Sequence, residues 1–97
     1  MTAPLAGLKV VDFSRVLAGP LCGRTLQDLG AHVTKIEPPR GDVSRLAMPI
    51  NPNGVTGYYA QQNAGKRNIS IDLNKDEAKE IAWKLVEEAD ILVENFC

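Results

Sequence analysis

Two short β-branched runs with one helical segment between them limit the fold of this chain more than any other feature. The runs Lys9–Phe13 and His32–Ile36 each have the length and composition of a buried strand. The stretch between them, Leu21–Leu29, is amphipathic, with Pro20 at its start and Gly30 at its end, where such residues favour a helix boundary. Strand, helix and strand in so short a segment predict a β-α-β unit with two parallel strands.

A second unit of the same kind follows a long loop. Residues 37–57 are rich in proline and glycine and predict a surface loop, and 58–63 predict a short helical turn. Residues 68–73 alternate polar and apolar as a strand does, 78–89 carry apolar residues at helical spacing, and 91–94 predict a further strand. The predicted fold is therefore α/β, a Rossmann-like parallel sheet built from two β-α-β units.

Several single residues have positions that predict a structural role. Asn74 followed by Glu77 is the pattern of a capping box, so we expect Asn74 to cap the second helix. Cys22 lies on the apolar stripe of the first helix and is expected to be buried packing rather than a nucleophile. Asp12 is expected to be structural, and His32, which has no partner pattern, is expected to be a solvated residue at a strand start.

Composition excludes several classes of partner. The chain has 97 residues and a net charge of -1, which fits one domain at most and argues against nucleic acid. It has neither the start of a signal peptide nor an apolar run of membrane-spanning length, so we expect no membrane partner. Its two cysteines are isolated, which is typical of a cytoplasmic protein with reduced thiols. No metal-ligand spacing occurs in the sequence.

Anion binding is possible where parallel strands end, because ligands collect beyond the carboxyl ends of such strands. The segment Ala18–Gly23 lacks the G-x-G-x-x-G pattern of a dinucleotide site, although Glu37 has the spacing of a ribose-binding acid. We therefore expect no NAD. Arg40 and the pair Lys66 and Arg67 are candidate phosphate contacts, and ordinary surface charge is the alternative for each.

Six segments stand in a fixed order along the chain: Leu5–Ser14, Ala18–Pro20, Leu26–Ala31, Val33–Glu37, Asn63–Arg67 and Ala89–Phe96. Together they closely resemble the opening of the family III CoA-transferases, the CaiB/BaiF group, which also contains α-methylacyl-CoA racemases. The resemblance covers essentially the whole chain. It implies an enzyme of which residues 1–97 are the N-terminal part of a Rossmann-like large domain that binds coenzyme A, with a small domain and an interlocked homodimer.

The resemblance also implies a reaction. In the transferases an aspartate attacks the acyl-CoA carbonyl, and CoA passes through an aspartyl thioester to a carboxylic acid. That aspartate is expected beyond Cys97, so no catalytic residue is assigned here. Leu17 stands where some members have Gln, and Asn74 precedes Lys75 where some have Lys. The positions that match CoA contacts of the family are Val16, Leu17, Ala18, Arg40, Ile71, Asn74, Lys75, Asn95 and Phe96.

Three functions therefore stay open. A CoA-transferase that acts on an acyl-CoA and a carboxylic acid is the first, an α-methylacyl-CoA racemase is the second, and a non-catalytic module that binds CoA or a nucleotide is the third. Because a strand at 91–93 is followed by only a few residues, we expect a truncated chain. Alone, it is expected to be inactive and to self-associate.

Overall fold

A computed structural model of the chain describes residues 3–46 and 56–96. Four strands form one sheet in which every pairing is parallel, in the order β3-β2-β1-β4. The predicted α/β, Rossmann-like architecture is confirmed. The elements are β1 (Lys9–Asp12), α1 (Ala18–Asp28), β2 (His32–Glu37), the 3-10 helix η1 (Val43–Leu46), α2 (Gly57–Asn63), β3 (Arg67–Ser70), α3 (Asp76–Glu88) and β4 (Ile91–Val93).

The order of the strands is not the one expected if two separate β-α-β units lay side by side. The chain steps from β1 to β2 and on to β3, and then α3 carries it back across the sheet, so that β4 pairs with β1. The two strands of the second predicted unit thus lie at opposite edges. The stretch predicted as a loop contains η1, and α2 completes a crossover between β2 and β3.

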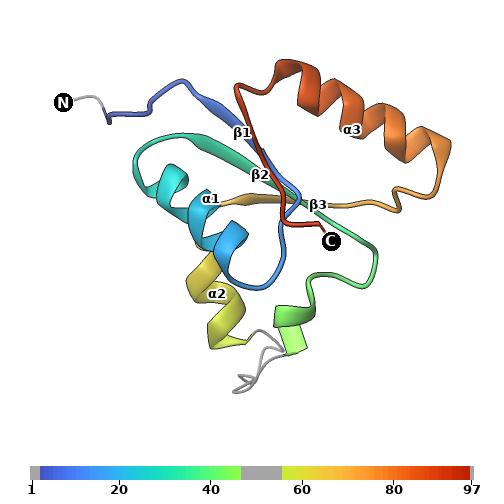
Figure 1. Cartoon of the computed structure of the whole chain (residues 1–97), viewed down its shortest axis with the longest axis horizontal. Helices are drawn as coiled ribbons and strands as arrows, with labels where there is room; N and C mark the ends of the chain where they lie inside the picture. Colours follow the sequence, from blue (N-terminus) through green and yellow to red (C-terminus); the bar gives the residue numbers. More distant parts are fainter. Residues whose placement is uncertain (1–2, 47–55, 97) are drawn as a thin grey trace.

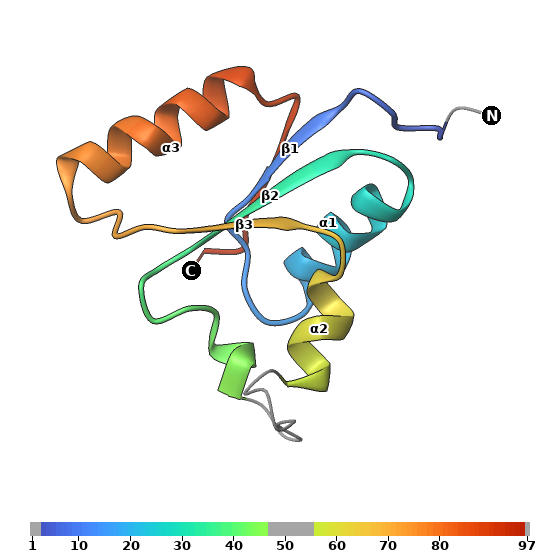
Figure 2. The same cartoon turned by 180° about the vertical axis from the view of Figure 1, so that it is seen from behind.

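The helices cover both faces of the sheet, with α1 and α2 on one side and α3 on the other (Figures 1 and 2). Because side chains alternate along a strand, neighbouring residues of one strand enter different cores. Val10, Val33 and Val93 pack on the α1 side, while Val11 and Ile36 pack against α3. The sheet is therefore the middle of three layers, and only its edges and loops remain open.

Helix α1 packs differently from the prediction. Its buried residues are Gly19, Pro20 and Gly23, whereas Leu21 is 48% exposed and Cys22 is exposed. The predicted burial of Cys22 was wrong, and of the predicted apolar stripe only Leu26 packs against the core, since Leu21 and Leu29 are exposed. The helix begins at Ala18, so Pro20 occupies the third helical position, where its missing N–H still costs no hydrogen bond.

Close packing explains why glycines face the sheet in α1. A Cβ atom on Gly19 would lie 2.1 Å from Cβ of Ser14, and one on Gly23 would lie 2.5 Å from Oδ2 of Asp12. No larger side chain fits at either position. Leu21 and Cys22 are turned outward, and polar groups at the end of β1 occupy the space below Gly19 and Gly23.

The carboxyl end of α1 agrees with the sequence prediction. Gly30 has φ +108° after the last turn of α1. Its N–H donates to the carbonyl of Gln27 at 3.0 Å, and the N–H of Ala31 donates to the carbonyl of Leu26 at 3.0 Å. These two bonds form a Schellman motif, in which glycine is the favoured residue.

The start of α3 does not agree with the prediction. The helix begins at Asp76, and Lys75 is at the N-cap position without a side-chain cap. Asn74 donates its N–H to Oδ1 of Asp72 at 3.0 Å, which closes a turn ahead of the helix. The predicted cap at Asn74 and its capping box were wrong, since the competing Asx-type turn is the one that forms.

Candidate functional site

The carboxyl ends of all four strands meet at one edge of the sheet, because the strands are parallel. The segments that leave this edge are 14–17, 38–42, 71–74 and 94–96. Successive connections run in opposite directions from β1, so the loops after β1 and β4 lie at a topological switch point. This is the place where open α/β sheets bind ligands.

The first hollow of the edge lies at this switch point and has a volume of about 580 Å³. It brings together five of the nine predicted CoA positions: the turn after β1, which gives three of them, and the end of β4, which gives two. Its lining residues are Arg15, Val16, Leu17, Ala18, Val43, Asn95 and Phe96.

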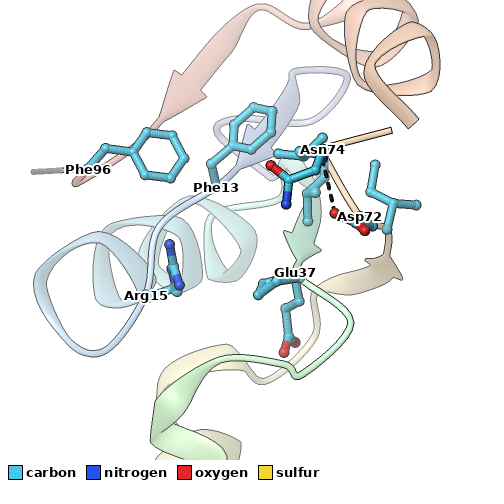
Figure 3. A pocket seen from close by; sticks show the side chains of 10 residues that line it. Phe13, Arg15, Glu37, Asp72, Asn74 and Phe96 are labelled. Carbon is cyan, nitrogen blue, oxygen red and sulfur yellow. Dashed lines mark hydrogen bonds between the residues drawn. The ribbon is translucent and has the colours of Figure 1, made fainter. Parts of the chain in front are cut away.

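A second hollow adjoins the first and is shown in Figure 3. Phe13 and Phe96 stand on one side of it, with ring centroids 6.1 Å apart. Ile71 and Asn74, two further predicted positions, also line it. Apolar walls with a few polar groups are typical of sites that bind a small molecule.

A third hollow contains the remaining predicted cation of the edge. It has a volume of about 230 Å³ and is lined by Arg40 together with Arg15, Pro38 and Val43 among others. Arg40 is exposed. Lys75 lines none of the three hollows, which together contain the other eight of the nine predicted positions.

A buried polar network lies beneath the edge, on the side of α1 and α2. Lys35 donates to Asp42 at 2.8 Å and to the amide oxygen of Asn63 at 3.0 Å. Lys66 donates to the same oxygen at 2.8 Å and to Asp12 at 2.8 Å. The structural role of Asp12 is confirmed. Lys66 was wrong as a candidate phosphate contact, because its amine is enclosed and already paired.

Glu37 belongs to the same network, and both of its carboxylate oxygens accept hydrogen bonds from neighbouring residues. Arg45 donates two hydrogen bonds of 2.8 Å to its carboxylate, and the hydroxyl of Tyr59 and the N–H of Asp42 donate further bonds. Burial alone would raise the pKa of Glu37, but these donors outweigh burial and lower it to about 2. These donors surround both carboxylate oxygens, where a ribose hydroxyl would otherwise bind, so Glu37 has a structural role.

The network also shifts the pKa of Lys66 and that of Asp42. Burial lowers the pKa of Lys66 despite its hydrogen bond with Asp12. Burial would raise the pKa of Asp42, but hydrogen bonds from Lys35 and Ser44 outweigh it and lower the pKa. Carboxylates and cations thus balance inside the fold, which the cost of an unpaired buried charge requires.

The turn after β1 is held from two directions. Val16 has φ +75°, a left-handed conformation that strains a β-branched residue. Its N–H points at the carboxylate of Asp42, at 3.3 and 3.4 Å from the two oxygens. The amide of Asn95 accepts the N–H of Arg15 at 3.0 Å and donates to its carbonyl at 2.8 Å. The strained turn therefore persists because its neighbours fix it.

Two other sequence expectations concern the opposite edge. Arg67 begins β3 and lines a surface hollow with Lys9 and His32, at the amino ends of the strands. Arg67 therefore lies away from the three hollows, one of which contains Arg40, and its role as a phosphate contact stays a prediction. His32 is exposed at a strand start, as predicted.

Sequence reasoning assigned no role to Arg15 or Asp42. Arg15 is the residue shared by all three hollows, and Asp42 joins the turn after β1 to the buried network. The signal for Arg15 was its place directly beyond a strand end. Asp42 had no such signal, because its partners come from β2 and the following loop only after folding.

Among residues 3–46 and 56–96, no group of three or more His, Cys, Asp and Glu side chains has an arrangement that suits a metal ion. In the same part of the chain, no helix has the length and apolar character needed to cross a membrane.

The chain is similar to known proteins, and this similarity identifies its family. A family profile described as CoA-transferase family III matches residues 5–97. The chain belongs to this family. The resemblance drawn from the six sequence segments is thereby confirmed.

Other family III proteins match over nearly the whole chain. A succinyl-CoA:mesaconate CoA-transferase from Haloarcula hispanica is 45% identical over 95% of the chain, and a formyl-CoA:oxalate CoA-transferase from Escherichia coli O6:H1 is 45% identical over 99%. These matches cover 24% and 23% of the two relatives. The chain thus spans about a quarter of the length of the curated relatives that it matches.

Solved structures agree with the fold. A CaiB/BaiF family protein from Brucella suis superposes with a TM-score of 0.92 at 46% identity, covering 99% of this chain and 26% of that one. A hypothetical protein from Mycobacterium tuberculosis superposes with a TM-score of 0.84 at 36% identity, covering 94% of this chain and 25% of that one. The four-stranded parallel sheet described above is therefore the fold of this family segment.

Proposed function

We propose that this chain is the CoA-binding N-terminal part of an acyl-CoA:carboxylate CoA-transferase. The observation that carries the proposal is the group of three adjoining hollows at the carboxyl edge of the sheet, lined by eight of the nine positions expected to contact CoA. The family, whose profile matches nearly the whole chain, supports the same assignment.

The three hollows suit the different parts of CoA. Ile71, Asn74 and the ring of Phe96 offer a partly apolar wall to an adenine, while Arg40 offers a cation to a phosphate. The turn Val16–Ala18 offers backbone groups at the start of α1 to the pantetheine arm. Lys75 stands apart from these walls and is proposed only as a contact at the outer end of the ligand.

The nucleophile of the reaction is proposed to lie in another part of the protein. In this proposal an aspartate beyond residue 97 takes the acyl group and then the CoA, and the residues described here keep the thiol carrier in place during both transfers. A homodimer is proposed for the whole protein on the same family grounds. The transferase names of the relatives favour this reaction over racemisation of an α-methylacyl-CoA.

Calorimetric titration of the full-length protein with CoA tests the binding part of the proposal. We expect saturable binding, and we expect new CoA thioesters in mass spectra after incubation with succinyl-CoA or formyl-CoA and a set of carboxylic acids that includes mesaconate and oxalate. Binding without exchange would support the non-catalytic module instead. If CoA did not bind, the proposed function would be wrong.

A further inference from the structure

Arg15 occupies the centre of the proposed CoA site. It is the residue that lines the hollow beside Ile71, the hollow beside Leu17 and the hollow beside Arg40. Figure 3 shows its side chain in the space between Phe96 and Glu37. Arg15 therefore borders the space where each pair of hollows adjoins.

Among the residues that the structure describes, no carboxylate pairs with the charge of Arg15. Lys35, Lys66 and Arg45 are each paired with a carboxylate of the buried network. The guanidinium of Arg15, in contrast, forms no ion pair with any residue among 3–46 and 56–96, and the residue is exposed. Its planar group presents several N–H donors that match phosphate oxygens in pairs.

The backbone of Arg15 is fixed although its side chain is free. Asn95 uses both ends of its amide on the N–H and the carbonyl of Arg15. The following N–H, that of Val16, is directed at Asp42, which is itself held by Lys35 at 2.8 Å and by the N–H of Ser44 at 2.9 Å. The cation is thus presented from a position that is set before any ligand arrives, which lowers the cost of binding.

We propose that Arg15 binds the diphosphate of CoA and that Asn95 is a positioning residue that orients Arg15. This inference rests on the proposed function. In CoA the diphosphate joins the adenosine to the pantetheine arm. A ligand with its adenine beside Ile71 and its arm along Leu17 therefore has its diphosphate at the meeting point of the hollows, where Arg15 stands.

The same observations change the role expected for Asn95. The sequence resemblance suggested a direct contact with CoA, but both ends of its amide already bond to the main chain of Arg15. The amide nitrogen has a second N–H and the amide oxygen a second lone pair, yet the orientation of the amide is set by the two bonds that it makes with Arg15. Its effect on the ligand is therefore exerted through Arg15.

Titration of the full-length protein with CoA and with dephospho-CoA tests the assignment of Arg15. Dephospho-CoA lacks the 3′-phosphate but keeps the diphosphate. We expect Arg15→Gln to weaken binding of both ligands by the same factor, about 10- to 100-fold for loss of a charge-assisted contact. Arg15→Lys is expected to recover part of this loss. Arg67→Gln, an exposed arginine at the opposite edge, is the matched control and is expected to change neither affinity.

Each other result contradicts a definite part of the inference. If Arg15→Gln weakened CoA but not dephospho-CoA, Arg15 would contact the 3′-phosphate and the diphosphate assignment would be wrong. If neither affinity changed, Arg15 would not contact the ligand. If the unmodified protein bound neither ligand, the proposed function itself would fail, and the inference with it.

A double-mutant cycle tests the positioning role of Asn95. Asn95→Ala removes both bonds to Arg15 and is expected to weaken CoA binding in the natural protein. In the Arg15→Gln background the same change is expected to have little further effect, because the group that Asn95 orients is already gone. Equal losses in both backgrounds would show that Asn95 acts independently of Arg15 and would overturn this part of the proposal.

Discussion

Glu37 shows at the scale of a single residue how the site is supported from below. Its carboxylate is 2% exposed and receives two hydrogen bonds from Arg45. Its pKa falls from an ordinary 4.5 to about 2, because these donors outweigh burial. A lowered carboxylate pKa means that the folded state favours the ionised form, so Glu37 stabilises the fold above pH 4.5 and loses this effect as pH falls towards 2.

We therefore predict that Glu37→Gln lowers the urea midpoint of the full-length protein at pH 7 and makes the midpoint less dependent on pH between 5 and 2. The pKa difference sets an upper limit of about 3 kcal/mol. Unfolding curves at several pH values measure the effect, with the exposed Glu80→Gln on α3 as control. A parallel pH dependence in the Glu37 variant and the unmodified protein would contradict the prediction.

Gly23 has a comparable role on the other side of the network. A Cβ at this position would meet Oδ2 of Asp12 at 2.5 Å and Cε of Lys66 at 3.1 Å, and both side chains are buried and paired. Gly23→Ala is predicted to destabilise the protein. Overpacking costs about 1–3 kcal/mol, whereas the better helix former contributes at most about 1 kcal/mol.

Thermal and urea unfolding of Gly23→Ala measure this balance. Gly57→Ala is a matched control, since Gly57 is also helical and a Cβ there would meet nothing within 4 Å. The control is expected to be neutral or slightly stabilising. If Gly23→Ala were as stable as Gly57→Ala, the close approach of α1 to Asp12 would be contradicted.

At the scale of the elements, local patterns predicted what local forces determine. The β-branched runs, the glycine end of α1 and the short helix before Lys66 were predicted within a few residues. The order of the strands was not, because it depends on how α3 crosses the sheet. The burial of α1 was not either, since Gly19 and Gly23 have no apolar side chain by which to detect a packed face.

The candidate site divides along the same line. Its position was predictable, because loops after parallel strands share one edge and because Val16 and Arg40 match positions of a family. The buried network was not predictable. Charged residues such as Lys35, Lys66 and Asp42 usually lie on a protein surface, and only the folded chain brings these three together beneath the edge. Periodicity carries no information on such long-range pairs.

At the scale of the whole molecule, an apolar surface remains open beside β4. Trp83 is 66% exposed and Leu92 is 51% exposed. They line one groove together with Phe13 and Leu73, between α3 and the free edge of the sheet. A continuous apolar surface of this kind is typical of an interface, and an unpaired edge strand adds to the tendency to associate. This surface is the physical basis for expecting the isolated chain to self-associate.

We predict that the 97-residue chain alone associates through this groove and shows no acyl exchange between CoA thioesters and acids. Trp83 is the single tryptophan of the sequence, so its emission reports on the groove directly. We expect a blue shift with rising concentration, in step with a higher sedimentation coefficient.

Trp83→Gln combined with Leu92→Gln is expected to keep the chain monomeric. The control Leu46→Gln, at an exposed leucine beside the third hollow, is expected to leave the association unchanged. A monomer at every concentration, with constant emission, would mean that the groove does not drive association; acyl exchange by this chain alone would place a complete catalytic centre within these residues.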